Sequence, residues 1–82
     1  MDESRPIART ARQRRQFAHK LTGRELDVIK MLLDDMHPKE IATELGVSYQ
    51  TVKNHLRNVR QVLGIRTTLG LGAYLLREGV IR

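Results

Sequence analysis

Three residues, 46–48 with the sequence GVS, join two segments whose apolar side chains recur at α-helical spacing. The glycine is typical of a helix end, and Ser48 is a favoured N-cap for the helix that follows. A connection this short forces the two helices to cross steeply instead of lying side by side. The chain is therefore expected to fold around a helix-turn-helix.

The second helix of this pair is expected to cover residues 49–63. One side of it is an apolar stripe formed by Val52, Leu56, Val59 and Leu63. The opposite side is polar or basic and consists of Gln50, Asn54, Arg57, Asn58 and Gln61, with Lys53 at its edge. A solvated helix usually mixes both signs of charge, so an outer face without acids indicates an anionic partner.

Two helices are expected before the turn. The first begins at Thr22, which with Glu25 matches the capping-box pattern, and Asp34 and Asp35 suit the turn that ends it. A short helix of about eight residues then begins at Pro38, because proline is tolerated in a first turn.

The last expected helix covers residues 68–78 and stops at Gly79. Its inner stripe is expected to contain Leu69, Ala73 and Leu76. A second apolar group projects to the other side and supplies the dimer-interface candidates Leu71, Tyr74 and Leu75. A single small domain cannot cover both sides, which favours a two-fold homodimer through this helix over scattered exposed apolar residues.

Residues 1–20 differ in composition from the remainder, with six Lys or Arg against two acids and no sustained apolar period. We expect a basic, mobile N-terminal arm, with some helix near residues 12–19. Two interpretations stay open, a solvated tail and an extension that meets a phosphate backbone. The predicted fold class is all-α: a compact four-helix domain over residues 21–82 that contains the helix-turn-helix.

Charge is distributed unevenly along that domain. Residues 21–44 carry three Lys or Arg against six acids, whereas residues 45–77 carry five against none. Basic residues gathered on one element are the electrostatic footprint of nucleic-acid binding. With only three aromatic residues in the chain, base stacking is a poor explanation for such binding.

Several other classes of protein are disfavoured. The chain has no cysteine, so it predicts neither a disulfide framework nor a thiolate zinc site. No apolar run approaches the roughly 18 residues of a membrane span, and no signal peptide is evident, so we expect a cytoplasmic protein. The three histidines are 18 residues apart and match no catalytic or metal motif, so neither an enzyme nor a metal site nor a cofactor is predicted.

Four segments, LTGRE, KEIATELGVSYQTVKNHLRNV, LGI and LLREGVI, occur in this order over residues 21–81. Together they resemble the DNA-binding domain of the LuxR/FixJ (GerE, NarL) family of bacterial transcription regulators. The resemblance implies a third helix that enters the major groove and a fourth helix that makes a dimer contact on an inverted repeat. The predicted function is a sequence-specific duplex-DNA-binding transcription regulator.

The resemblance also implies roles for individual residues. The base-contact candidates are Lys53, Asn54 and Arg57. The backbone-contact candidates are Thr22, Lys39, Ser48, Tyr49, Gln50, Thr51, Asn58 and Arg60. Lys and Arg donate to guanine O6 and N7 and Asn pairs with adenine, whereas Ser, Thr and Gln bond phosphate oxygens. For His55 we favour a structural role over a DNA contact.

The chain departs from the family pattern at several positions. Val62 stands where a Lys or Arg is usual, Thr68 where an arginine is common, and Asp35 and His37 where a glycine and a hydroxyl cap are usual. Val62 and Thr68 motivate an alternative function, a protein-interaction module that binds RNA polymerase or another regulator with little DNA specificity.

Family members commonly carry a receiver or ligand-binding domain before this one, and only about 20 residues precede Leu21 here. On the premise that the chain is complete, we expect control by expression level, a partner protein or dimer formation.

Overall fold

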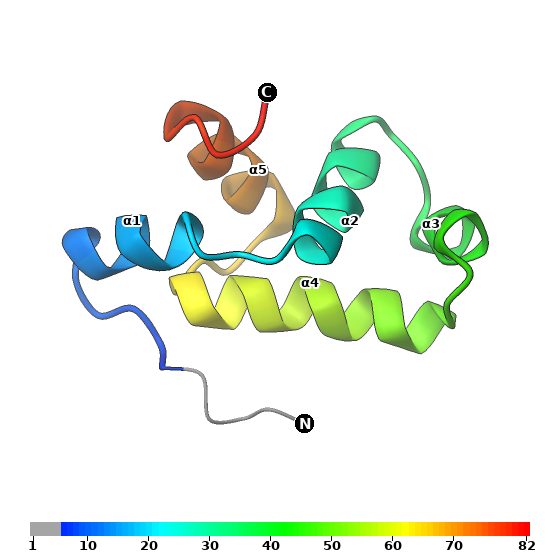
Figure 1. Ribbon diagram of the computed structural model, residues 1–82, viewed down its shortest axis with the longest axis horizontal. Coiled ribbons are helices and arrows are strands. Elements are labelled where there is room, and N and C mark those ends of the chain that lie inside the picture. The colour runs from blue at the N-terminus through cyan, green and yellow to red at the C-terminus, as the bar shows by residue number, and fades with distance from the viewer. Residues whose placement is uncertain (1–5) are drawn as a thin grey trace.

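The computed structural model describes residues 6–82, which form five α-helices and no strand (Figure 1). The helices are α1 (Ala11–Ala18), α2 (Gly23–Leu33), α3 (Pro38–Leu45), α4 (Tyr49–Leu63) and α5 (Thr68–Arg77). The Cα radius of gyration is 12.1 Å. The expected all-α class is confirmed, and the four expected helices correspond to α2–α5. Within the described part, no helix is long and apolar enough to cross a membrane.

The longest helix, α4, lies across the molecule and the others pack against it (Figure 1). α3 packs at its N-terminal end, α2 along its middle, and α1 and α5 near its C-terminal end. The core between them is almost entirely aliphatic, with fully buried side chains from α2, α3, α4 and α5: Val28, Ile29, Ile41, Val52, Val59, Leu63, Leu71 and Leu75. This arrangement leaves one long side of α4 without a covering helix.

Local hydrogen bonds fix where α2 begins. The Thr22 hydroxyl accepts from the Glu25 backbone N–H at 3.1 Å, and a Glu25 carboxylate oxygen accepts from the Thr22 backbone N–H at 3.0 Å. The capping box expected from the sequence is therefore present.

α3 begins with a less usual cap. Nδ1 of His37 accepts from the Lys39 backbone N–H at 3.0 Å, and the Glu40 carboxylate accepts from the His37 backbone N–H at 2.7 Å. The imidazole thus replaces the usual hydroxyl as the capping acceptor. Asp35, where the family has a glycine, takes a left-handed conformation with φ of 69°, a region open to aspartate at a cost that glycine avoids.

The turn between α3 and α4 follows the sequence prediction. Gly46 has φ of 69°, which allows α3 to stop abruptly. The Ser48 hydroxyl accepts from the Thr51 backbone N–H at 3.0 Å and caps α4. These two residues set the steep crossing that presents α4 as the second helix of the helix-turn-helix.

The expected orientation of α5 is wrong. Leu71, Tyr74 and Leu75, the dimer-interface candidates, are 1%, 8% and 0% exposed and lie in the core of the chain itself. Burial is the main cause that raises the pKa of the Tyr74 phenol, with the Glu78 carboxylate adding to it. Leu69 and Leu76, the expected inner stripe, are 81% and 49% exposed. The buried side of α5 also carries Gly72, which lies against the Leu33 side chain of α2.

Residues 6–20 pack against the domain, which differs from the mobile arm expected from their composition. The Ala8 backbone N–H donates to the carbonyl of Val62 at 2.8 Å, and Ala18 at the end of α1 is fully buried. An ion pair of 3.4 Å joins Arg15 on α1 to Glu78 after α5. Polar contacts with the end of α4 hold this segment in place. Apolar periodicity in the sequence does not predict contacts of this kind. The part of the expected arm before Pro6 lies outside the described residues.

Candidate nucleic-acid interface

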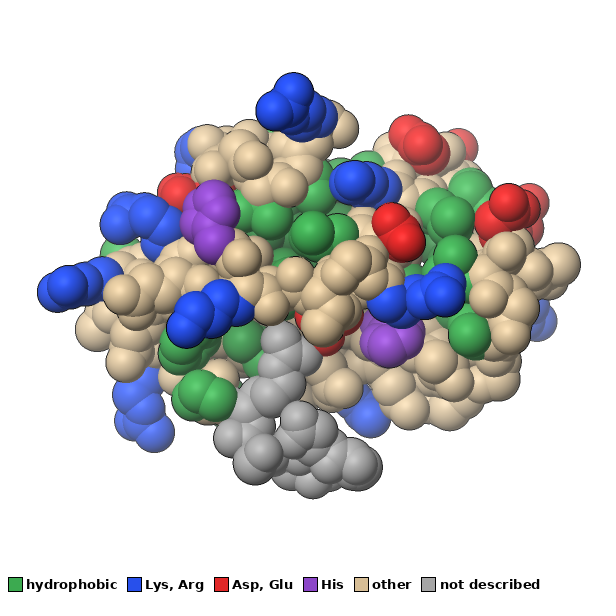
Figure 2. Space-filling view, viewed as in Figure 1, with side chains coloured by type: hydrophobic (Ala, Val, Ile, Leu, Met, Phe, Trp, Pro, Cys, Tyr) green, Lys and Arg blue, Asp and Glu red, His purple; other side chains and the backbone are tan. Residues whose placement is uncertain are grey.

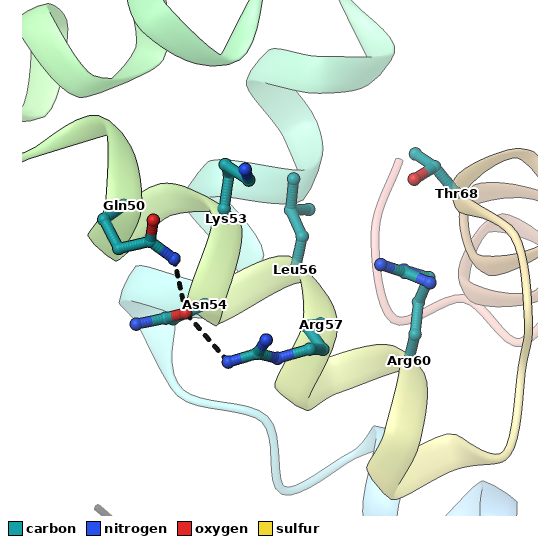
Figure 3. A pocket seen from close by; sticks show the side chains of 7 residues that line it. All are labelled: Gln50, Lys53, Asn54, Leu56, Arg57, Arg60 and Thr68. Atoms are coloured by element: carbon teal, nitrogen blue, oxygen red, sulfur yellow. Dashed lines mark hydrogen bonds between the residues drawn. The ribbon is translucent and has the colours of Figure 1, made fainter.

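The uncovered side of α4 carries a chain of hydrogen-bonded polar side chains. Oδ1 of Asn54 accepts from Nε2 of Gln50 at 3.1 Å and from Nη2 of Arg57 at 3.0 Å (Figure 3). These residues stand one helical turn apart, so their side chains form a row along the helix surface. The amide and guanidinium groups are thereby held in order before any ligand arrives.

An open hollow lies beside this row. Figure 3 shows its lining, which comes from the outer side of α4 and the first residue of α5: Gln50, Lys53, Asn54, Leu56, Arg57, Arg60 and Thr68. A second shallow hollow continues past the end of α4 and is lined by Arg57, Arg60, Gln61, Gly64, Ile65 and Arg66. Neither lining contains an acidic residue, so the surface attracts anions along the length of α4.

Two lysines converge on one aromatic ring at the N-terminal end of α4. Nζ of Lys39 on α3 lies 5.6 Å from the centre of the Tyr49 ring, and Nζ of Lys53 on α4 lies 5.2 Å from it. Cation–π attraction holds both ammonium groups near the helix N-terminus, whose dipole adds further positive potential. An anionic group such as a phosphate is favoured at this end of α4.

Arg60 occupies the opposite end of the hollow and is braced by the turn that follows α4. Its Nη1 donates to the backbone carbonyl of Arg66 at 3.0 Å, while its buried Nε has no hydrogen-bond partner among residues 6–82. The side chain is therefore held between α4 and the start of α5 rather than fully extended into solvent. A ligand approaching the hollow would meet the outer edge of this guanidinium group.

The structure brings the base-contact candidates together with some of the backbone-contact candidates. All three base-contact candidates and two backbone-contact candidates, Gln50 and Arg60, line the same hollow. Ser48 and Thr51 lie at the N-terminus of α4, where their hydroxyls are 2.9 Å apart. Asn58 is exposed further along α4. Thr22 lines neither hollow, and its hydroxyl caps α2.

Sequence reasoning missed some of the lining. Thr68 was noted only as a departure from a family pattern, and the structure places it at the rim of the hollow beside Arg60. Arg66 was treated only as part of the basic charge, although its carbonyl holds the Arg60 side chain. These positions reach the site only because α5 and the turn before it pack against α4. The helical periodicity of α4 does not predict that packing.

Opposite charges gather at different places on the surface. Figure 2 shows acidic side chains clustered over α2 and α3, whereas lysine and arginine side chains surround the end of the molecule formed by α1. Among the described residues, no group of three or more His, Asp or Glu side chains is arranged to hold a metal ion. The linings of the two hollows consist mainly of hydrogen-bond donors and cations on an open helix face.

A family model described as bacterial regulatory proteins, luxR family, matches residues 19–71. The spore germination protein GerE of Bacillus subtilis is 44% identical over 59 residues, which are 72% of this chain and 80% of GerE. The nitrate/nitrite response regulator protein NarP of Escherichia coli is 40% identical over 58 residues, 71% of this chain and 27% of NarP. The transcriptional regulatory protein MctR of Rhizobium johnstonii is 39% identical over 61 residues, 74% of this chain and 28% of MctR. The chain thus spans about a quarter of the length of NarP and MctR.

Proposed function

Because the chain belongs to the luxR family of bacterial regulatory proteins, we propose that it binds specific sequences of duplex DNA and thereby regulates transcription in the cytoplasm. The family consists of DNA-binding transcription regulators and not of enzymes. The observation that carries the proposal is the outer side of α4, where the row formed by Gln50, Asn54 and Arg57 lies in an open hollow without acids.

In the proposed complex, the outer side of α4 lies in the major groove. The groove is about 12 Å wide and admits an α-helix, and α4 has no helix packed on this side. Arg57 and Lys53 donate to guanine O6 and N7, and Asn54 pairs with adenine. Oδ1 of Asn54 already accepts hydrogen bonds from Gln50 and Arg57. To pair with adenine, Asn54 must give up at least one of these two bonds and accept from the base instead.

Phosphate contacts at the two ends of α4 fix the register of the complex. Lys39 and Tyr49 meet one phosphate at the N-terminal end, and Arg60 meets another near the start of α5. Neutral donors to the same DNA backbone come from the side chains of Ser48, Thr51, Asn58 and Gln50. Thr22 is exposed, and its hydroxyl, whose oxygen caps α2, still has an O–H that can donate to a phosphate oxygen.

We further propose a homodimer through the outer side of α5. The stripe of Leu69, Ala73 and Leu76 is exposed and apolar, and it takes the place of the buried residues that sequence analysis named. A two-fold contact places two copies of α4 on half-sites about one helical turn of DNA apart, some 34–36 Å. Leu69→Glu is expected to lower the sedimentation mass of a dimeric parent chain to that of a monomer. An unchanged mass would exclude this stripe as the interface.

The test of the DNA-binding proposal is selection of bound sequences from random duplex DNA, followed by fluorescence anisotropy with the selected and a scrambled duplex. We expect an inverted repeat, preferential binding of the selected duplex, and affinity that falls steeply with salt. Binding without sequence preference at low salt would contradict the proposal. It would favour instead a module that uses the exposed α5 stripe to bind RNA polymerase or another regulator.

A further inference from the structure

One flank of α4 is covered by the N-terminal segment of the chain. Val62 is only 6% exposed, and it shares an open hollow with Pro6, Phe17 and Lys20. Three separate stretches of sequence therefore meet at this flank, and the position where the family usually carries a cation is apolar and packed. Lys20 brings a positive charge to the rim of the same hollow.

Hydrogen bonds to the last carbonyls of α4 hold the segment in place. The carbonyl of Val62 accepts from the backbone N–H of Ala8, and the carbonyl of Leu63 accepts from Nε of Arg14 at 2.7 Å. These are carbonyls that the end of a helix leaves without internal partners. Arg9 follows Ala8 directly in the chain, so its backbone position is fixed relative to the end of α4.

This flank adjoins the outer side of α4. On a helical wheel Val62 lies about 40° from Asn58 and about 100° from Gln61, so it stands between the outer side and the core. Arg9 and Lys20 are exposed, and neither has a carboxylate partner within the described part of the chain. Lys20 thus lies at the Val62 flank, and the exposed Arg9 adjoins it through the backbone bond of Ala8.

We propose that Arg9 and Lys20 form a second phosphate-binding surface, which contacts the DNA backbone along the Val62 flank of α4. This surface supplies the positive charge that the α4 sequence lacks at position 62. The inference rests on the proposed DNA-binding function and adds the N-terminal segment to the interface. Its ligand is the sugar–phosphate backbone of a duplex, so it contributes affinity without sequence preference.

Arg9→Ala and Lys20→Ala, made separately in the full chain, test this surface against the control Arg12→Ala. Arg12 lies on the same helix as Arg14 but about 160° away from it, on the side of α1 that faces away from α4. Binding of the selected duplex and of a scrambled duplex is measured by anisotropy over a range of salt concentrations. Affinity falls with salt, and each test variant is expected to reduce the magnitude of the slope of log affinity against log salt by about 0.9. The control is expected to leave the slope unchanged.

Several outcomes separate this inference from the proposed function. Equal weakening on both duplexes supports phosphate binding, and Lys20→Glu should weaken both further. If both alanine variants kept the salt slope of the parent chain, the second phosphate-binding surface would be overturned. An equal fall in the slope of Arg12→Ala would overturn it too. Either result would leave α4 as the helix that recognises the DNA sequence. Weakening confined to the selected duplex would assign the residue to base readout and also overturn it. A parent chain that binds no duplex would remove both proposals. Far-UV circular dichroism checks that each variant retains the parent helix content.

Discussion

α4 and α5 both carry two distinct faces, but only for α4 does hydropathy decide which face is buried. On α4 the apolar stripe and the basic, polar side are separated, so burial of apolar area has a single solution. On α5 leucines occupy both sides, so hydropathy alone does not decide which side is buried. Amphipathicity therefore predicts the orientation of a helix only when its two faces differ in polarity.

The side of α5 that is buried also carries a glycine, Gly72. A Cβ added at Gly72 would lie 2.5 Å from a methyl carbon of Leu33, the end of a side chain that is 40% exposed. The glycine belongs to the same side as Leu71 and Leu75, and that side becomes the core.

The strongest test of this contrast uses two adjacent leucines of α5. Leu75 is 0% exposed and Leu76 is 49% exposed. We expect Leu75→Ala to lower the free energy of unfolding by about 2–5 kcal/mol, because it leaves a cavity in the core. Leu76→Ala should change it by less than about 1 kcal/mol. Urea unfolding followed by circular dichroism measures both, and equal losses would show that α5 is not oriented as described.

Much of the remaining fold could be predicted because its signals are local. Thr22 with Glu25, Gly46 and Ser48 each satisfy backbone groups within a few residues of themselves. Sequence spacing alone therefore locates the ends of α2, α3 and α4. The candidate site on α4 was predictable for the same reason, since one helix supplies most of its side chains.

What sequence could not predict depends on contacts between distant segments. The packing of residues 6–20 rests on Ala8, Arg14 and Arg15, whose partners lie at the far end of the chain. No periodic pattern marks a backbone N–H that bonds a helix-terminal carbonyl. The burial of Val62 became interpretable only once this segment was seen to cover it.

A second test asks whether the polar side of α4 reads bases. Arg57→Ala should weaken binding of the selected duplex by about 1–3 kcal/mol and relax the base preference at one position of the site. It also releases one of the two donors to Oδ1 of Asn54, so the adenine preference assigned to Asn54 should be retained. Lys30→Ala on α2 is the matched control for loss of one positive charge. Equal weakening of selected and scrambled duplexes by Arg57→Ala would reassign Arg57 to the phosphate backbone.

The smallest expected effect compares the caps of the two helices. Ser48 accepts from the Thr51 backbone N–H and Thr67 accepts from the Gly70 backbone N–H, both at 3.0 Å. Replacing either residue by alanine removes one capping bond and should lower the free energy of unfolding by about 0.5–2 kcal/mol.

DNA binding should separate the two cap variants although their stabilities agree. Ser48 lies at the end of α4 that we assign to phosphate binding, so Ser48→Ala should weaken selected and scrambled duplexes alike. Thr67→Ala acts on a helix that packs through its leucines, and the folded fraction should bind as the parent does. Anisotropy titrations corrected for the folded fraction measure this difference. If both variants bound as the parent does, the end of α4 would serve only as a helix cap. The contrast between a helix that binds and a helix that packs would then rest on the row from Gln50 to Arg57 alone.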